Sequence, residues 1–214
     1  MANGIVYVGS NADAVFYALN AKTGAPLWSY PTCWHLDSAP AIAKGVVYVG
    51  DWCGNVYALN ASSGAMLWSA STDGGIVYRG PAVANGVVYI GTNYGSLFAI
   101  QANTGARLWS FYTGGGIYAS PGVANGVVYI GSKGHVLYGL NTRTGAQLGS
   151  FNANADVNGS PAVANGVFYV GADPGYTYAI NARTGVLLWS GSGHVDSSPT
   201  VVDGMVTSAP ATTA

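Results

Sequence analysis

The segment YALNASSGAMLW at 57–68 recurs along the chain with small changes. The other copies read YALNAKTGAPLW at 17–28, FAIQANTGARLW at 98–109, YGLNTRTGAQLG at 138–149 and YAINARTGVLLW at 178–189. Each copy predicts a strand, a tight turn that ends in glycine, and a second strand, which contains a tryptophan in all copies except that at 138–149. A repeat of this kind determines the architecture, so the domains are counted from it.

The glycines that precede each apolar run give the period of the repeat. They are Gly4, Gly45, Gly86, Gly126, Gly166 and Gly204, with steps of 41, 41, 40, 40 and 38 residues. A complete unit begins at Ser38 and reads SAPAIA, VVYVG, NVYALNA and MLWSA, which we denote strands A to D. The turns between strands A and B, such as Asn85-Gly86, favour a type I′ hairpin. A period near 40 built only of short strands is typical of β-propeller blades.

The sequence therefore predicts an all-β fold, a five-bladed β-propeller of four-stranded antiparallel blades. Residues 4–9 predict a strand B with no strand A before it, and 198–204 predict a strand A with no complete blade after it. We expect this C-terminal strand A to pair with the N-terminal strand B and close the ring, which removes open sheet edges. Residues 1–204 then form a single domain, and 205–214 are a surplus tail. The alternative is that the chain is a piece of a longer array.

Composition excludes two classes of partner. Of the 214 residues, 50% are hydrophobic and 7% charged, and the formal net charge is −1. The seven Lys and Arg residues are scattered, so no basic patch for nucleic acid is expected. The apolar runs are short and broken by Gly, Asn or Ser, so no membrane span is expected. No signal peptide is visible, so we expect the chain to begin inside a longer precursor or to have been trimmed.

Four tryptophans follow a turn glycine at the same distance. The pairs are Gly24 with Trp28, Gly64 with Trp68, Gly105 with Trp109, and Gly185 with Trp189. At the start of an outer strand, a large flat ring can lie across the gap to the adjacent blade, where a glycine leaves room for it. These pairs are the predicted blade-docking residues.

From Gly4 to Gly204 the chain resembles the pyrroloquinoline quinone (PQQ)-like repeat family. The resemblance lies in the tryptophan-docking motif Ala-x-Asp-x-x-x-Gly-x-x-x-Trp, which stands here as Ala58-x-Asn60, Gly64 and Trp68 and recurs in register. Asn or Gln replaces the family's Asp in every copy. The fourth copy has Gly139 and Gly149 in place of Ala and Trp, so one inter-blade dock is missing.

The resemblance also implies what an enzyme of this family would need. Quinoprotein dehydrogenases hold PQQ with a vicinal disulfide and a Ca²⁺ ion bound by Glu and Asn. This sequence has no adjacent cysteines and no Glu. We therefore expect no enzyme activity and no cofactor, and neither PQQ nor a divalent cation is favoured.

Polar and aromatic residues stand shortly before the strand-A prolines, where side chains spaced by two point the same way. We expect them at the channel mouth on the loop face, as a tentative ligand site made of His35, Asp37, Tyr78, Arg79, Tyr118, Asp156, Asn158, His194 and Asp196. In a closed ring the His-x-Asp pairs at 35/37 and 194/196 become neighbours. His35, Asp37, His194 and Asp196 are thus weak metal candidates. The alternative, which is favoured, is that the acids cap their own loops and no ligand binds.

Cys33 and Cys53 fall in two loops of the same face. We expect a disulfide between them, which fits an extracytoplasmic protein, whether periplasmic or secreted. The alternative is two free thiols. The leading functional hypothesis is a non-catalytic binding or scaffold propeller, monomeric, with a protein partner or small ligand at its loop face. The alternatives are a small-ligand or cation receptor, a fragment of a quinoprotein dehydrogenase, and an array selected or built for its architecture.

Overall fold

The computed structural model describes residues 4–72, 75, 79–182, 184–192, 198–202 and 205–207, and these contain only β-strands, turns and loops. No helix in this described part could cross a membrane. The strands fall into six antiparallel sheets in sequence order. The predicted all-β fold of repeated antiparallel sheets is therefore confirmed.

The sheets follow the predicted repeat. The first has three strands, the next four have four each, and the last has two. Their bounds are β1 Ile5–Gly9, β2 Val15–Asn20 and β3 Pro26–Pro31; β4 Ala41–Ala43, β5 Val46–Gly50, β6 Asn55–Asn60 and β7 Met66–Ser71; β8 Ala82–Ala84, β9 Val87–Gly91, β10 Ser96–Gln101 and β11 Arg107–Tyr112; β12 Gly122–Ala124, β13 Val127–Gly131, β14 Val136–Asn141 and β15 Gln147–Asn152; β16 Ala162–Ala164, β17 Val167–Ala172, β18 Tyr176–Asn181 and β19 Leu187–Ser192; β20 Thr200–Val202 and β21 Met205–Thr207. We number these sheets as blades 1 to 6.

The residues at the turns explain the positions of the two hairpins in each blade. Asn85 and Gly86 both have positive φ, 51° and 79°, as the first hairpin of a blade requires. In the second hairpin the side-chain oxygen of Asn60 accepts hydrogen bonds from the backbone N–H groups of Ser62 and Ser63. Asn thus performs the turn-capping role open to the family's Asp, because both side chains offer an oxygen at the same position.

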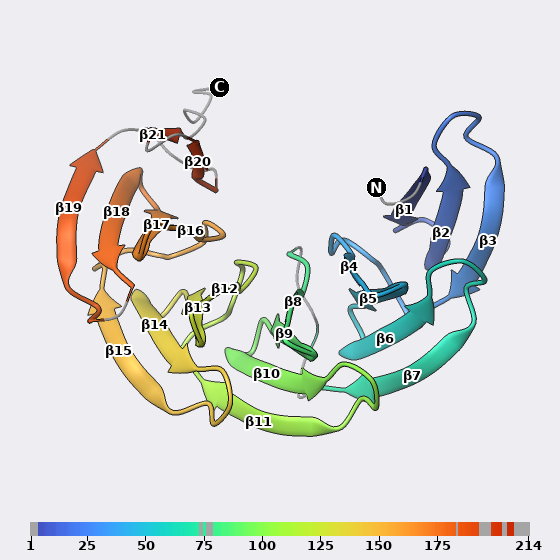
Figure 1. Ribbon diagram of the computed structural model, residues 1–214, viewed down its shortest axis with the longest axis horizontal. Coiled ribbons are helices and arrows are strands. Elements are labelled where there is room, and N and C mark those ends of the chain that lie inside the picture. Colours follow the sequence, from blue (N-terminus) through green and yellow to red (C-terminus); the bar gives the residue numbers. More distant parts are fainter. Residues whose placement is uncertain are drawn as a thin grey trace.

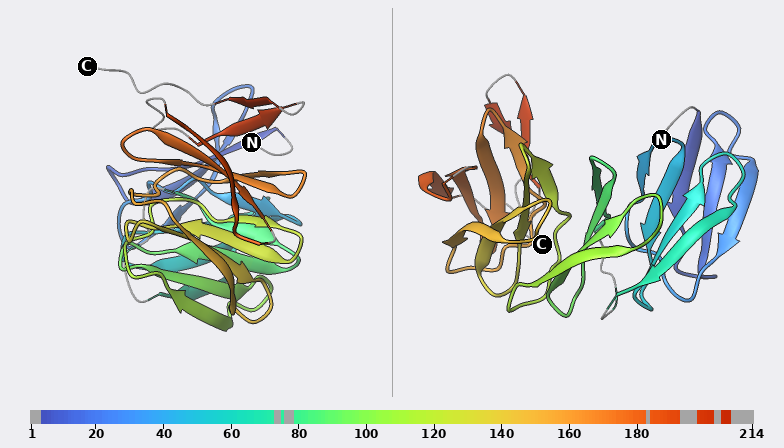
Figure 2. Two further views of the ribbon diagram at one scale, coloured as in Figure 1. Left: turned by 90° about the vertical axis from the view of Figure 1, so that its left-hand side faces the viewer. Right: turned by 60° about the horizontal axis from the view of Figure 1, so that its bottom comes forward.

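The blades stack side by side along an arc (Figure 1). The short strands β4, β8, β12, β16 and β20 line its concave side, and the long outer strands β3, β7, β11, β15 and β19 form its convex side. Apolar clusters fill the spaces between successive blades, so the core is a series of layers. Each cluster joins the strands of two blades, such as Tyr48 and Val56 of blade 2 with Ile90 and Phe98 of blade 3. Figure 2 shows the same stack from two other directions.

The expected ring closure is wrong. Strand β20 pairs with β21, with Val201 opposite Val206, and β1 pairs only with β2 in the described residues. The two ends of the arc face each other across a gap (Figure 1). Residues 205–207 of the expected tail form the second strand of a sixth, partial blade. The local hairpin prevails because the packing between blades sets their angle, and at this angle five blades do not complete a circle.

Candidate functional site

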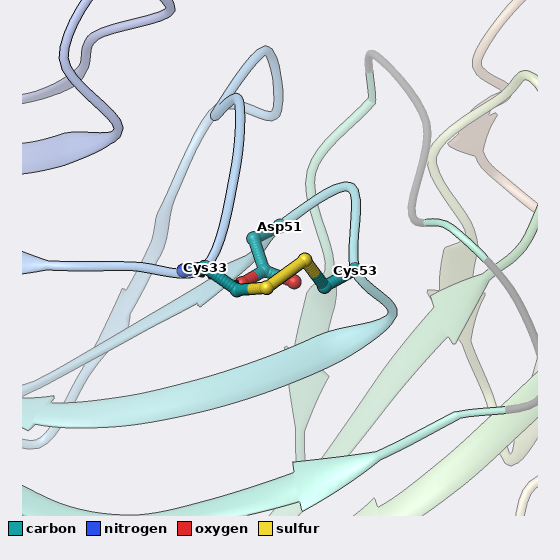
Figure 3. Close-up of side chains that lie close together, drawn as sticks. All are labelled: Cys33, Asp51 and Cys53. Atoms are coloured by element: carbon teal, nitrogen blue, oxygen red, sulfur yellow. Dashed lines mark hydrogen bonds between the residues drawn. A yellow bond between two sulfur atoms is a disulfide. The ribbon is translucent and has the colours of Figure 1, made fainter.

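The loops between strands B and C and between blades emerge on one face, and a disulfide joins two of them. Cys33 follows β3 and Cys53 follows β5, and their sulfurs are bonded. Figure 3 shows the bond beside the carboxylate of Asp51. The predicted Cys33–Cys53 disulfide is thus confirmed. It ties the exit of blade 1 to the loop of blade 2.

The carboxylate of Asp51 is fully buried, and hydrogen bonds from its neighbours compensate for its loss of contact with water. Its oxygens accept hydrogen bonds from the backbone N–H of Cys33 (3.2 Å), the backbone N–H of Asn55 (2.9 Å) and the hydroxyl of Tyr57 (2.9 Å). Asp51 lies within 4.8 Å of both sulfurs, a set that resembles a metal site. Because the sulfurs are bonded to each other, they are not thiolate ligands, and Asp51 instead fixes the two loops.

Burial, then the hydrogen bond to Asp51 and its negative charge, raises the pKa of Tyr57 well above its usual value. Burial also raises the pKa of Tyr48, Tyr89, Tyr129 and Tyr178. These hydroxyls hold their protons to higher pH in the folded chain than in the unfolded chain. Their contribution to stability is therefore complete below about pH 10 and is lost as the pH rises through the folded-state values.

We expect the urea midpoint of unfolding to be flat from about pH 7 to 9.5 and to fall above about pH 10. In the Tyr57→Phe variant the midpoint should be lower at neutral pH, because Asp51 loses a donor, and its decline above pH 10 should be shallower. Circular dichroism at each pH measures both effects. An equally steep decline in the variant would contradict the assignment to Tyr57.

An aromatic cluster stands beside the disulfide. The ring of His35 lies between those of Trp34 and Trp52, with centroid distances of 5.7 and 5.8 Å. The backbone N–H of Trp52 donates to the carbonyl of His35 at 3.1 Å, which joins the two loops. The indoles of Trp34 and Trp52 remain 56% and 41% exposed. We call Trp34, His35 and Trp52 the aromatic platform.

The structure describes six of the nine residues predicted to form the ligand site. His35 and Asp37 follow β3 of blade 1, which lies at one end of the arc (Figure 1). Tyr78, His194 and Asp196 lie outside the described residues. The four-residue metal set, which includes two of them, therefore stays a prediction.

The remaining predicted residues have separate neighbours. The side-chain amide of Asn11 donates to Asp37, and the carboxylate of Asp156 lies 3.2 Å from Nδ1 of His135. The ammonium of Lys133 lies 4.5 Å from the ring centroid of Tyr118. Oδ1 of Asn158 is buried and has no hydrogen-bond partner in the described part of the chain.

Asp37 and Arg79 line one hollow on the concave side. It holds about 730 Å³ of space between atoms, part of it open to solvent, and Ser120 and Ser160 also border it. The serines belong to a hydrogen-bonded row, in which the backbone N–H of Ser120 donates to Oγ of Ser160 at 3.0 Å, and that of Ser160 to Oγ of Ser198. A binding role for Asp37 and Arg79 stays a prediction.

The docking tryptophans lie against the following blade. A Cβ added to Gly64 would be 2.7 Å from the indole of Trp28, and one added to Gly105 would be 2.9 Å from that of Trp68. Gly24 has nothing within 4 Å of such an atom, and Trp189 is 44% exposed at the end of the stack. Each indole therefore needs the glycine of the next blade, one repeat further along the chain.

Sequence reasoning missed several partners. Asn11, Lys133 and His135 lie in the loops between strands B and C, and Asp51 was not considered. Gly145, which receives Trp109, was also missed although its Thr-Gly turn was visible in the repeat. Residues in separate blades meet here, and the period of 40 residues does not reveal such pairs.

Comparison with known proteins identifies a family. The sequence profile of the family described as outer membrane protein assembly factor BamB matches residues 1–77, 53–150 and 132–213. No curated protein sequence matches the chain.

Solved structures show the same fold at low sequence identity. BamB from Moraxella catarrhalis is 19% identical with a TM-score of 0.82, over 95% of this chain and 66% of BamB. The computationally designed protein Ika8 is 20% identical with a TM-score of 0.85, over 98% of this chain and 66% of Ika8. Quinohemoprotein alcohol dehydrogenase ADHIIG from Pseudomonas putida HK5 is 22% identical with a TM-score of 0.72, over 88% of this chain and 40% of the enzyme. The chain thus spans less than two thirds of the length of each of these structures.

Proposed function

The chain belongs to the family of the outer membrane protein assembly factor BamB, and from this premise we propose that it is a non-catalytic scaffold that binds a protein partner through its loop face. The aromatic platform carries the proposal. Contiguous exposed apolar patches mark interaction sites, and tryptophans are over-represented among the residues that dominate binding energy at protein interfaces. Trp34 and Trp52 are both well exposed.

The platform is also held in place before a partner arrives. The Cys33–Cys53 bond, the hydrogen bond from Trp52 to His35 and the Asp51 network fix its two loops. Binding to a fixed surface costs less conformational entropy than binding that must first order the loops. Ordered aromatic rings therefore support a recognition role for this surface.

The residues do not fit the cofactor of the related dehydrogenases. The two cysteines of this chain are 20 residues apart in sequence and bonded to each other, and the chain has no Glu. A vicinal disulfide and a Glu ligand for Ca²⁺ are therefore absent from this sequence. This supports a binding role over a dehydrogenase role.

We also propose an extracytoplasmic location. A disulfide persists in an oxidising compartment and is rare in the cytosol. The family is named for outer membrane assembly, which agrees with that compartment. The same name suggests the partner: a strand-forming segment of an outer membrane protein, in which apolar and polar residues alternate.

The test uses a fluorescein-labelled ten-residue peptide with alternating aromatic and polar residues. Fluorescence anisotropy should show saturable binding to the wild type, weakened at least about tenfold in the Trp34→Ala, Trp52→Ala double variant, as expected for loss of two aromatic contacts. Leu108→Ala is the matched control, because Leu108 is 47% exposed at the start of β11, near the opposite face. Equal affinity in the double variant would remove the platform from the proposal, and dye-linked alcohol oxidation with added PQQ and Ca²⁺ would overturn the non-catalytic role.

A further inference from the structure

Three inter-blade docks share one geometry. The indole N–H of Trp28, Trp68 and Trp109 donates to a backbone carbonyl of the next blade, that of Ala61, Ala102 and Thr142, at 3.0, 2.9 and 3.1 Å. Each of these carbonyls also accepts a tyrosine hydroxyl. The ring itself covers a glycine of the next blade. The chain therefore contains three copies of a working indole-binding site.

The fourth dock, between blades 4 and 5, has the glycine and the carbonyl that receive an indole but lacks the indole itself. Gly149 stands opposite Gly139 in the pairing of β14 with β15, where the other blades have tryptophan opposite alanine. The receiving Gly185 is present, and a Cβ added to Gly149 would lie 3.7 Å from its Cα. A small hollow that is partly open to solvent lies at this position.

The hydrogen-bond acceptor of the missing indole is also retained. The carbonyl of Ala182 corresponds to those of Ala61, Ala102 and Thr142, and it accepts the hydroxyl of Tyr129 at 2.6 Å. Among the described residues this hydroxyl is its one recorded donor. A carbonyl oxygen has two lone pairs and can accept a second bond.

The walls are apolar and partly aromatic. Tyr129, Leu137 and Ile180 are buried around the hollow, and Leu148 at its edge is 52% exposed. Phe168 occupies a position where the other blades have Val47, Val88 and Val128, and its ring centroid lies 4.6 Å from that of Tyr129. Phe168 reaches in from the inner strand β17, whereas the missing indole belongs to the outer strand β15. Gly149, Gly185 and Phe168 all line the hollow.

We infer that the space between blades 4 and 5 is a binding site for a small indole-type molecule. The ring lies against Gly185 beside Gly149, contacts the wall that Tyr129 provides, and donates its N–H to the carbonyl of Ala182. This site is separate from the aromatic platform and does not depend on the proposed function. A planar aromatic ligand without an N–H group fills the space but donates no second hydrogen bond to the carbonyl of Ala182.

The test is calorimetric titration of the wild-type chain with indole and with 1-methylindole. Indole should bind one site with a Kd of about 10 µM to 1 mM, the range open to so small a ligand. 1-Methylindole should bind about tenfold more weakly, because it lacks the donor for Ala182. Phe168→Val, which enlarges the space, should tighten indole binding at least about threefold.

Gly149→Trp supplies the ring from the chain itself and should abolish indole binding. Leu108→Ala, on an outer strand at a different blade, should leave it unchanged. No heat of binding to either the wild type or Phe168→Val would overturn the inference, and so would binding that persists in a folded Gly149→Trp protein. Equal affinities for indole and 1-methylindole would remove Ala182 from the site and also contradict it.

Discussion

Trp109→Ala should lower the free energy of unfolding by about 3–5 kcal/mol, the range measured for large aromatic residues removed from cores. The indole of Trp109 is only 9% exposed, lies against Gly145 and donates to the carbonyl of Thr142. Its removal leaves a cavity between blades 3 and 4, because the backbone strands on either side cannot close fully over it. Urea unfolding followed by circular dichroism measures the loss.

Trp189→Ala is the matched control for this prediction. Trp189 has the same place in its repeat but is 44% exposed, and its recorded aromatic contact is Tyr169 at 6.1 Å. Its loss should therefore cost less than about 1.5 kcal/mol. Equal effects of the two substitutions would show that the receiving blade contributes nothing to the dock.

The second large loss of stability is expected when the disulfide is removed. The Cys33→Ala, Cys53→Ala variant should lose about 3 kcal/mol, because the bond closes a loop between residues 20 apart and restricts the unfolded chain. The backbone N–H of Cys33 also holds Asp51, so the platform loops should loosen. Urea unfolding measures the loss of stability, and the rate of amide hydrogen exchange at Trp34 and Trp52 measures how far the loops loosen.

Reducing agent provides the control. Dithiothreitol should lower the stability of the wild type by a similar amount and leave the double variant unchanged, because only the wild type has a bond to reduce. A variant as stable as the oxidised wild type would mean that the Asp51 network holds the loops without the covalent link.

The arc stays open because the docks fix the angle between successive blades. Each filled dock sets the angle between two blades through an indole, a glycine and a shared carbonyl. Alignment with 66% of BamB and of Ika8 at TM-scores of 0.82 and 0.85 shows that the blades here have the angles found in longer propellers. A blade angle of that size is too small for five blades to close.

The sequence alone determined the blades, their strands and the turn positions, because each depends on neighbours within about 40 residues. The Asn-Gly turns, the short apolar run of strand β10 and the glycine before Trp68 are all local signals. The disulfide was also predictable, since Cys33 and Cys53 fall in adjacent loops of one face. Even the missing dock was visible, because Gly149 breaks a pattern that the other copies keep.

Only the tertiary structure decided whether the ends meet. Strand β20 could pair with β1 or with β21 by the same hydrogen-bonding pattern, and the angle accumulated over five blades placed β1 out of reach. The binding role of the predicted rim stays a prediction, because His194 and Asp196 lie outside the described residues. The tertiary structure likewise paired Asp156 with His135 and left an acceptor and a glycine beside Gly149. Contacts between blades depend on the sum of many small angles, which a repeating sequence does not specify.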